Sequence, residues 1–166
     1  MSFRRAAIIQ MTANLPQTSS KLEGPLVKQF SVFLPNKVGA MLDVVKLLNA
    51  HDYHVIAMSV SESTDAAIAR LVVSDPEGAE KLFRQKNIAF GMCEVVVVEM
   101  HEVATELSKL FATLFMGELN VHFTYPLLMR PREQAALAIH VDDNDCAISV
   151  LSGAGFRLLS QTDISR

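Results

Sequence analysis

The sequence predicts an α+β fold made of two βαββαβ units in tandem, with antiparallel sheets and helices on one side. Segments in which every second residue is apolar alternate with segments in which apolar residues recur at helical spacing. The order of these segments from residue 27 to residue 98 is strand, helix, strand, strand, helix, strand. The same order then recurs towards the C-terminus, as expected of an internal repeat.

The first unit opens with an alternating strand over residues 27–34. A helix is expected over 39–51, and it is followed by two strands, 54–62 and 66–74, around a polar turn. Apolar residues mark the buried face of that helix: Met41, Val44, Val45 and Leu48.

The first unit ends with a helix and a strand. Asp75 is placed to cap a helix over 76–86 that Pro76 opens, and residues 89–100 form a last strand. This element order is the ferredoxin-like pattern.

The second unit repeats the first at an offset of 66 to 68 positions. An offset of 66 aligns Gly39 with Thr105, and an offset of 68 aligns Asp75 with Asp143. Helices are expected over 103–116 and 144–153, and strands over 119–127, 134–141 and 156–161. Because residues 94–100 both close the first unit and open the second, we expect units fused edge to edge in a single extended sheet.

The chain therefore divides into a leader and two units. Residues 1–26 contain a basic pair, a short apolar stretch and a Pro-, Ser- and Thr-rich segment, which predicts a flexible leader rather than a secretory signal. Residues 27–98 and 95–166 are the two predicted domains.

Composition excludes several classes of protein. Half of the 166 residues are apolar, which suits a packed core, and the net charge of -3 provides no basic surface for nucleic acid or an anionic membrane. The apolar runs are too short to span a bilayer, so we expect a cytoplasmic protein. Cys93 and Cys146 lie far apart and suggest neither a disulfide framework nor a zinc knuckle.

Motifs for catalysis or metal binding are incomplete. The segment HEVAT at 101–105 lacks the second histidine of a zinc-protease motif, and DDNDCA at 142–147 lacks the glycine and distal glutamate of a calcium loop. His51 and His54 have no third ligand nearby in sequence. We therefore expect no enzyme activity, no metal and no cofactor.

One stretch, FLPNKVGAMLDVVKLLNAHDYHV at residues 33–55, resembles the opening of an ACT domain, in which a strand, a polar turn, a helix and a strand follow one another. The resemblance covers residues 27 to about 162 as two copies and is weaker in the second copy. It implies a small regulatory protein that binds an amino acid between two ACT units, where the turn of one unit faces the second strand of its neighbour.

The turn from Asn36 to Ala40 has properties that suit a ligand carboxylate. The first amides of a helix lack intrahelical acceptors and lie at the positive end of the helix dipole. Gly39 permits close approach to these amides. The predicted ligand-binding residues of the turn are Asn36, Lys37, Val38, Gly39 and Ala40. The alternative is that Asn36 only caps the helix and Gly39 only relieves crowding.

The second turn departs from this pattern. It has Glu102 in place of Asn36 and Thr105 in place of Gly39, and both changes oppose a bound carboxylate. We expect a single competent pocket, in which the first turn faces the second strand of copy two. The residues predicted to line that side are Val121, His122, Phe123 and Thr124.

A ligand-binding regulatory module is the function that these features favour. A protein–protein interaction or dimerisation module without a small ligand is the alternative, since the same fold exposes strand edges. In either case we expect no output domain in this chain, and therefore a homodimer or a complex with a separate effector protein.

Overall fold

The computed structural model describes residues 24–62 and 66–165. It confirms two βαββαβ units and shows a single seven-stranded sheet. The predicted leader lies almost entirely outside the described residues. The first unit comprises β1 (Leu26–Pro35), α1 (Ala40–Asn49), β2 (Val55–Glu62), β3 (Ala66–Val73), α2 (Pro76–Gln85) and β4 (Phe90–Met100).

The second unit begins with the same strand, β4. It continues through α3 (Val103–Met116), β5 (Val121–Pro126), the 3-10 helix η1 (Pro131–Glu133), β6 (Ala135–Val141), α4 (Asn144–Gly153) and β7 (Arg157–Leu159). A short helix, α5 (Gln161–Ile164), follows, which the sequence reasoning missed. It is one turn long and is held by a capping box at Ser160, a signal too local to separate from a loop.

Strand β4 joins the two units. The strand order is β2-β3-β1-β4-β6-β5, and β7 also pairs with β4. On one edge, β1 pairs with the first part of β4 and β7 pairs with residues 97–99. On the other edge, β6 pairs with residues 96–100. One long strand therefore completes the sheet of the first unit and opens that of the second.

The sheet is curled, which differs from the extended sheet expected. Its two edge strands meet where Ala57 forms a bridge with Leu127, and the amide of Leu128 donates to the Ile56 carbonyl at 2.8 Å. Two causes favour the curl: strands twist in one hand, and apolar side chains on the concave face bury one another. That inner core draws on both units and includes Val27, Ile56, Val72, Val95, Val97, Tyr125, Ala138 and Leu159.

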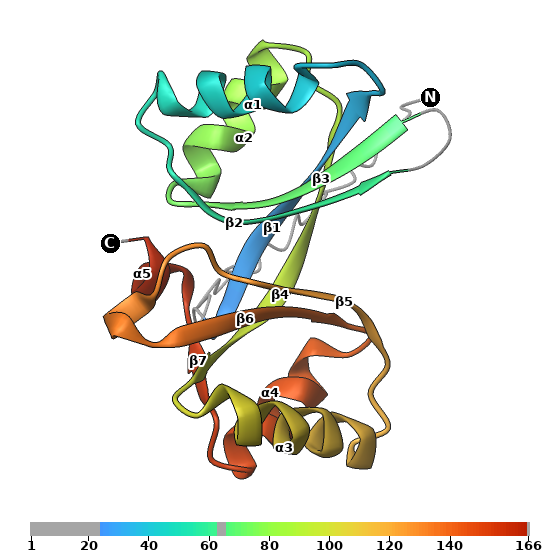
Figure 1. Cartoon of the computed structure of the whole chain (residues 1–166), viewed down its shortest axis with the longest axis vertical. Coiled ribbons are helices and arrows are strands. Elements are labelled where there is room, and N and C mark those ends of the chain that lie inside the picture. Colours follow the sequence, from blue (N-terminus) through green and yellow to red (C-terminus); the bar gives the residue numbers. More distant parts are fainter. Residues whose placement is uncertain (1–23, 63–65, 166) are drawn as a thin grey trace, which may run out of the picture.

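The four long helices pack on the opposite, convex face of the sheet. Along β4, Phe90 contacts the core under α1 and α2, whereas Val96 and Val98 belong to the core under α3 and α4. These three residues alternate with Val95 and Val97 of the inner core. The prediction of helices on one side is thus confirmed, and the curl carries the two helix pairs to opposite ends of the molecule (Figure 1).

The predicted helix caps of α2 and α4 are present. Asp75 accepts a hydrogen bond from the Gly78 amide, and Asp143 accepts one from the Cys146 amide, each at 2.9 Å. These equivalent caps satisfy amides that would otherwise lack an acceptor.

Candidate functional site

The first βα turn requires a glycine. Gly39 is the N-cap of α1, with φ 90° and ψ -9°, in the left-handed region that residues with a Cβ rarely adopt. Among the described residues, a Cβ built at this position meets nothing within 4 Å. The turn therefore offers open space next to its backbone, and the glycine is explained by conformation rather than by crowding.

The helix that follows the turn has unused amide donors. No side chain caps α1, and the hydrogen bonds found among the described residues do not use the amides of Val38 and Gly39. This contrasts with α2 and α4, each capped by an aspartate. Free amides at the positive end of a helix suit a carboxylate or a similar anion.

Asn36 does not cap α1. Its Nδ2 donates to Oε1 of Glu62, at the end of β2, at 3.3 Å. This places a carboxylate beside the turn that sequence reasoning did not include, because the contact depends on how β2 lies in the folded sheet. Lys37 is exposed, and its amide donates to the Pro35 carbonyl at 2.8 Å.

The second turn holds a carboxylate from its own chain. Oε2 of Glu106 accepts from the amides of His101 at 2.7 Å and Glu102 at 3.1 Å. Glu106 aligns with Ala40 at the 66-residue offset, so the first turn has no equivalent group. Sequence reasoning assigned the difference to Glu102 and Thr105. The signal it missed was the acidic residue directly after Thr105.

The predicted partner segment, Val121–Thr124, contains a β-bulge. Val121 pairs with Val141 and Phe123 with His140, so the register shifts between them. Val121 packs against the core under α3 and α4, whereas Phe123 packs against the inner core. The Thr124 hydroxyl donates to the Ala138 carbonyl at 2.8 Å.

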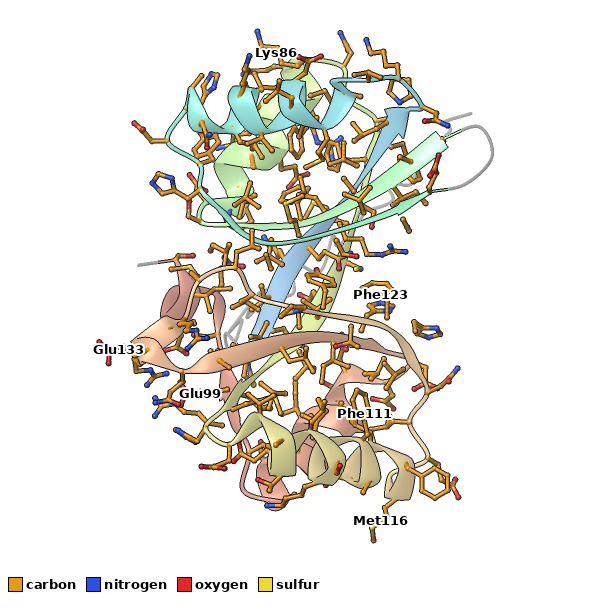
Figure 2. All side chains as sticks on the ribbon, in the orientation of Figure 1. Lys86, Glu99, Phe111, Met116, Phe123 and Glu133 are labelled. Carbon is orange, nitrogen blue, oxygen red and sulfur yellow. The ribbon has the colours of Figure 1, made fainter. Side chains whose placement is uncertain are left out.

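A stack of aromatic and cationic side chains surrounds Phe123, which Figure 2 shows at one side of the molecule. The Arg70 guanidinium lies 4.4 Å from its ring centroid, and the His140 ring stacks on it at 4.7 Å. The His122 ring is 5.2 Å from that of His140. Burial, together with the nearby His122 and Arg70, lowers the pKa of His140.

The structure does not bring Val121–Thr124 to the first turn within one chain. Arg70, which contacts Phe123, pairs across the sheet with Ser31 of β1. Asn36 lies five residues after Ser31 along the chain. At about 3.3 Å per residue, the Cα atoms of Ser31 and Asn36 are roughly 16 Å apart. The two segments therefore do not form one pocket in a single chain, and the assignment of each to a ligand stays a prediction.

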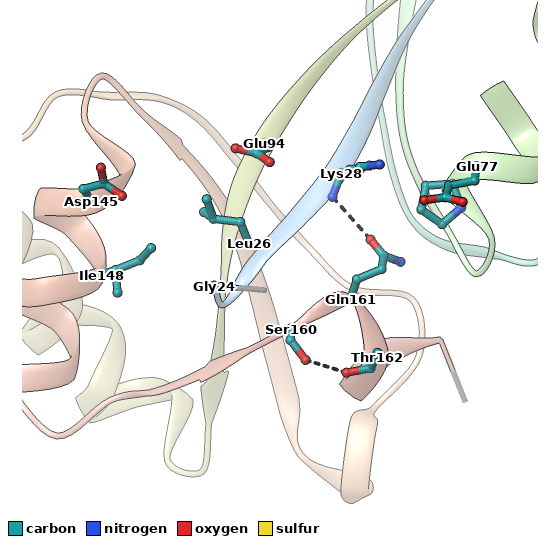
Figure 3. A pocket seen from close by; sticks show the side chains of 11 residues that line it. Gly24, Leu26, Lys28, Glu77, Glu94, Asp145, Ile148, Ser160, Gln161 and Thr162 are labelled. Carbon is teal, nitrogen blue, oxygen red and sulfur yellow. Dashed lines mark hydrogen bonds between the residues drawn. The ribbon is translucent and has the colours of Figure 1, made fainter. Parts of the chain in front are cut away.

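A cavity of about 470 Å³ lies elsewhere, between the two helix pairs (Figure 3). Leu26, Lys28 and Glu94 form part of its lining on the sheet, and Glu77 and Asp145 line it from α2 and α4. Its lining carries charges of both signs, because Lys28 lies among the carboxylates. The cavity contains none of the predicted site residues.

Other kinds of site find no support in the described part of the chain. No group of three or more metal-ligating side chains occurs among residues 24–62 and 66–165. None of the described helices combines the length and apolarity that a membrane span requires.

Two βαββαβ units fused through a shared strand, each with a βα turn, define a pair of ACT-type modules. The family model described as ACT domain pair matches residues 26–165. The chain therefore belongs to the ACT domain pair family. The comparison with curated protein sequences gives no significant match.

Solved structures share the fold. Protein BT0572 from Bacteroides thetaiotaomicron superposes with a TM-score of 0.79 at 26% identity, over 87% of this chain and 99% of that one. The regulatory subunit of aspartate kinase from Thermus thermophilus gives 0.56 at 10% identity, over 78% and 91%. Its counterpart from Thermus flavus gives 0.52 at 12% identity, over 78% and 92%.

Proposed function

We propose that the chain is a non-catalytic regulatory protein that binds an amino acid at the turn Asn36–Ala40. The observation that carries the proposal is the contrast between the two turns. Among the described residues, the first has unused amides and a left-handed glycine with open space beside it. The second already holds the Glu106 carboxylate.

The residues around the first turn suggest how both charges of an amino acid are bound. The α-carboxylate accepts from the free amides of Val38 and Gly39. The Glu62 carboxylate, held beside the turn by Asn36, is placed to accept from the α-ammonium group. The names of the aspartate kinase regulatory subunits, which share this fold, support a regulatory role.

A second copy of the chain provides the other side of the proposed pocket. Strand β5 lies at the edge of the sheet, and its contact with β2 is made near Leu127, beyond Val121–Thr124. The outer edge of this segment has no strand partner in the described part of the chain, so it is available to a neighbouring molecule. We propose a homodimer in which Val121, His122, Phe123 and Thr124 of one copy approach the turn of the other. A separate effector protein then reads the bound state.

An interaction module without a small ligand is the second candidate. It is favoured by the large exposed side chains of Phe115 and Met116 at the end of α3. Figure 2 shows Met116 pointing away from the body of the molecule.

Thermal-shift measurements with the twenty amino acids separate the two candidates. A ligand at 100 times its dissociation constant adds about 2.7 kcal/mol to the free energy of unfolding. We expect at least one amino acid to raise the melting temperature of the parent chain. If none does so, the interaction module is favoured.

A pair of matched variants assigns the effect to the turn. Gly39→Val fills the space next to the amides, and we expect it to abolish the shift. Gly155→Val is the control, because Gly155 also has a left-handed backbone (φ 87°) and open space, but lies after α4. A ligand response lost equally in both variants would count against the turn.

A further inference from the structure

A buried carboxylate lies on the concave face of the sheet beside the second turn. Glu99 belongs to β4, and its side chain is only 4% exposed. Its Oε2 atom has no hydrogen-bond partner among the described residues. Buried carboxylate oxygens are normally hydrogen-bonded, so this oxygen needs an explanation.

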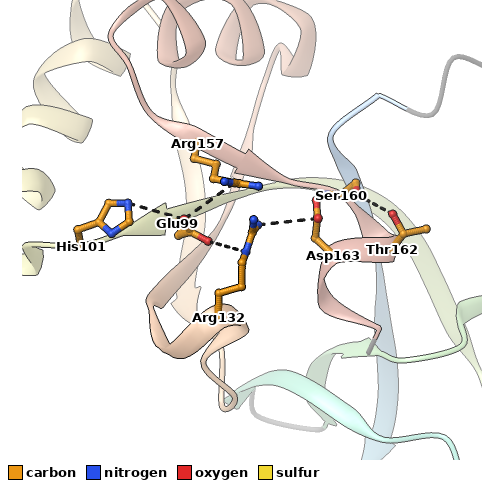
Figure 4. Close-up of polar contacts among 7 residues, drawn as sticks. All are labelled: Glu99, His101, Arg132, Arg157, Ser160, Thr162 and Asp163. Carbon is orange, nitrogen blue, oxygen red and sulfur yellow. Dashed lines mark hydrogen bonds and ion pairs between the residues drawn. The ribbon is translucent and has the colours of Figure 1, made fainter.

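Three basic side chains from separate elements surround Glu99 (Figure 4). Arg132 Nε lies 3.4 Å from Oε2, and His101 Nε2 and Arg157 Nε lie 3.7 and 4.0 Å from Oε1. These three side chains are 44%, 61% and 56% exposed, in the order given. The cluster therefore combines the buried negative charge of Glu99 with the positive charges of Arg132 and Arg157, which are exposed to solvent.

The distances leave the charges only loosely paired. Charge-assisted hydrogen bonds between nitrogen and carboxylate oxygen are about 2.7–2.9 Å long, and each separation at Glu99 exceeds this range. Arg132 also makes a contact of 3.8 Å with Asp163. Part of the hydrogen-bonding capacity of both guanidinium groups and of Glu99 is thus unused.

Arg132 reaches this position from an uncommon backbone. It has φ 52° and ψ 34°, and the following residue, Glu133, has φ 65°. Left-handed conformations are infrequent for residues other than glycine. Arg132 in the short η1 segment thus lies beside Glu99 with its backbone in the left-handed region.

The first unit has no equivalent cluster, so the fold does not require one. At the 66-residue offset, Glu99 aligns with Phe33 and Arg157 with Gly91. Phe33 is a half-exposed apolar side chain. The charged groups thus distinguish the second unit, whose own turn is filled by Glu106.

The charge pattern selects the class of ligand. Glu99 would repel a simple anion, and the two guanidinium groups would repel a simple cation. A small zwitterion satisfies both signs, with its ammonium group on Glu99 and its carboxylate between Arg132 and Arg157. We propose that this cluster is a second binding site for a free α-amino acid, separate from the first turn. This inference rests on the proposed function in taking an amino acid as the ligand.

The test observes both sites by NMR on the full chain. The side-chain Nε–Hε signals of Arg132 and Arg157 report on the cluster, and the amide signals of Val38 and Gly39 report on the first turn. Each of the twenty amino acids is titrated into the millimolar range. Acetate and methylammonium are the controls, because each carries only one of the two charges.

We expect at least one amino acid to shift both arginine signals in a saturable way, with neither control doing so. Glu99→Gln should weaken this binding about tenfold to a hundredfold, whereas Glu80→Gln, in the Arg84 ion pair on α2, should leave it unchanged. Arg157→Lys keeps the charge but loses the planar guanidinium, so we expect weaker binding there too.

Four results would overturn the inference. They are an absence of arginine shifts with every amino acid, equal shifts with acetate or methylammonium, unchanged binding in folded Glu99→Gln, and loss of the arginine response in folded Gly39→Val. If only the Val38 and Gly39 amides respond, the cluster is excluded and the proposed function stands. If only the arginine signals respond, the cluster is supported and the first turn is not the site.

Discussion

Gly39 adopts a backbone conformation that a residue with a Cβ enters only at a cost. Its equivalent in the second unit, Thr105, lies instead inside α3, which begins at Val103. At the 66-residue offset, α3 starts three residues earlier than α1, and the turn before it has no glycine. The open first turn depends on this single residue.

The first prediction concerns that conformation. Gly39→Ala should lower the free energy of unfolding by about 1–2 kcal/mol, because alanine is strained at φ 90°. Gly39→Asn should cost less, since asparagine tolerates the left-handed region. Urea denaturation measures both. If both variants are as stable as the parent chain, the glycine is not required by the backbone.

The second prediction concerns His140. Burial, His122 and Arg70 lower its pKa, so the folded chain holds the neutral form at a pH where the unfolded chain binds a proton. The free energy of unfolding should therefore fall as pH decreases below about 6.5. Replacing the imidazole in His140→Asn should reduce this dependence.

Denaturation at several pH values between about 7.5 and 5 tests this dependence. His54→Gln is the control, because His54 is exposed and lies directly before β2, away from the stack. A pH dependence unchanged in His140→Asn would show that other groups cause it.

Between elements, a buried polar contact joins the two units. The Tyr125 hydroxyl on β5 donates to Gln29 Oε1 on β1 at 2.6 Å, and Gln29 is completely buried. Burial also raises the pKa of Tyr125, since the neutral phenol is favoured there. This contact fixes where β5 lies over the first unit.

The third prediction follows from that contact. Tyr125→Phe leaves the Gln29 oxygen without its donor and should cost about 1–3 kcal/mol of stability. Tyr53→Phe is the matched control, because no hydrogen bond of the Tyr53 hydroxyl occurs among the described residues. Equal stability losses in the two variants would rule out a special role for the Gln29 contact.

Elements were more predictable than their assembly. The helix expected over 103–116 has those limits in the structure, and the helix expected over 39–51 is α1 at Ala40–Asn49. Such limits depend on local spacing and caps. The curl was not predictable, because it depends on contacts between distant residues such as Ala57 and Leu127. For the same reason, the sequence alone does not predict that Glu62 lies beside the first turn or that Arg132 lies beside Glu99.

At the scale of the whole molecule, β4 and the inner core belong to both units. Neither unit is complete without that strand. We therefore predict one cooperative unfolding transition. Amide signals of Leu71 in β3 and Ala138 in β6 should fade at the same urea concentration. Two separate midpoints would show that the units unfold independently.

The proposed ligand and the proposed second copy contact different parts of the sheet. The proposed ligand site lies next to α1 and the ends of β1 and β2, whereas the proposed second copy approaches through β5. Under the proposed function, a bound amino acid changes the surface that is available to a partner.

The most direct test is an NMR titration of the amide signals with the twenty amino acids. We expect at least one of them to shift the amides of Val38 and Gly39 in a saturable way, and Gly39→Val to remove the effect. The proposed function would be contradicted if every amino acid left these two amides unchanged throughout the millimolar range.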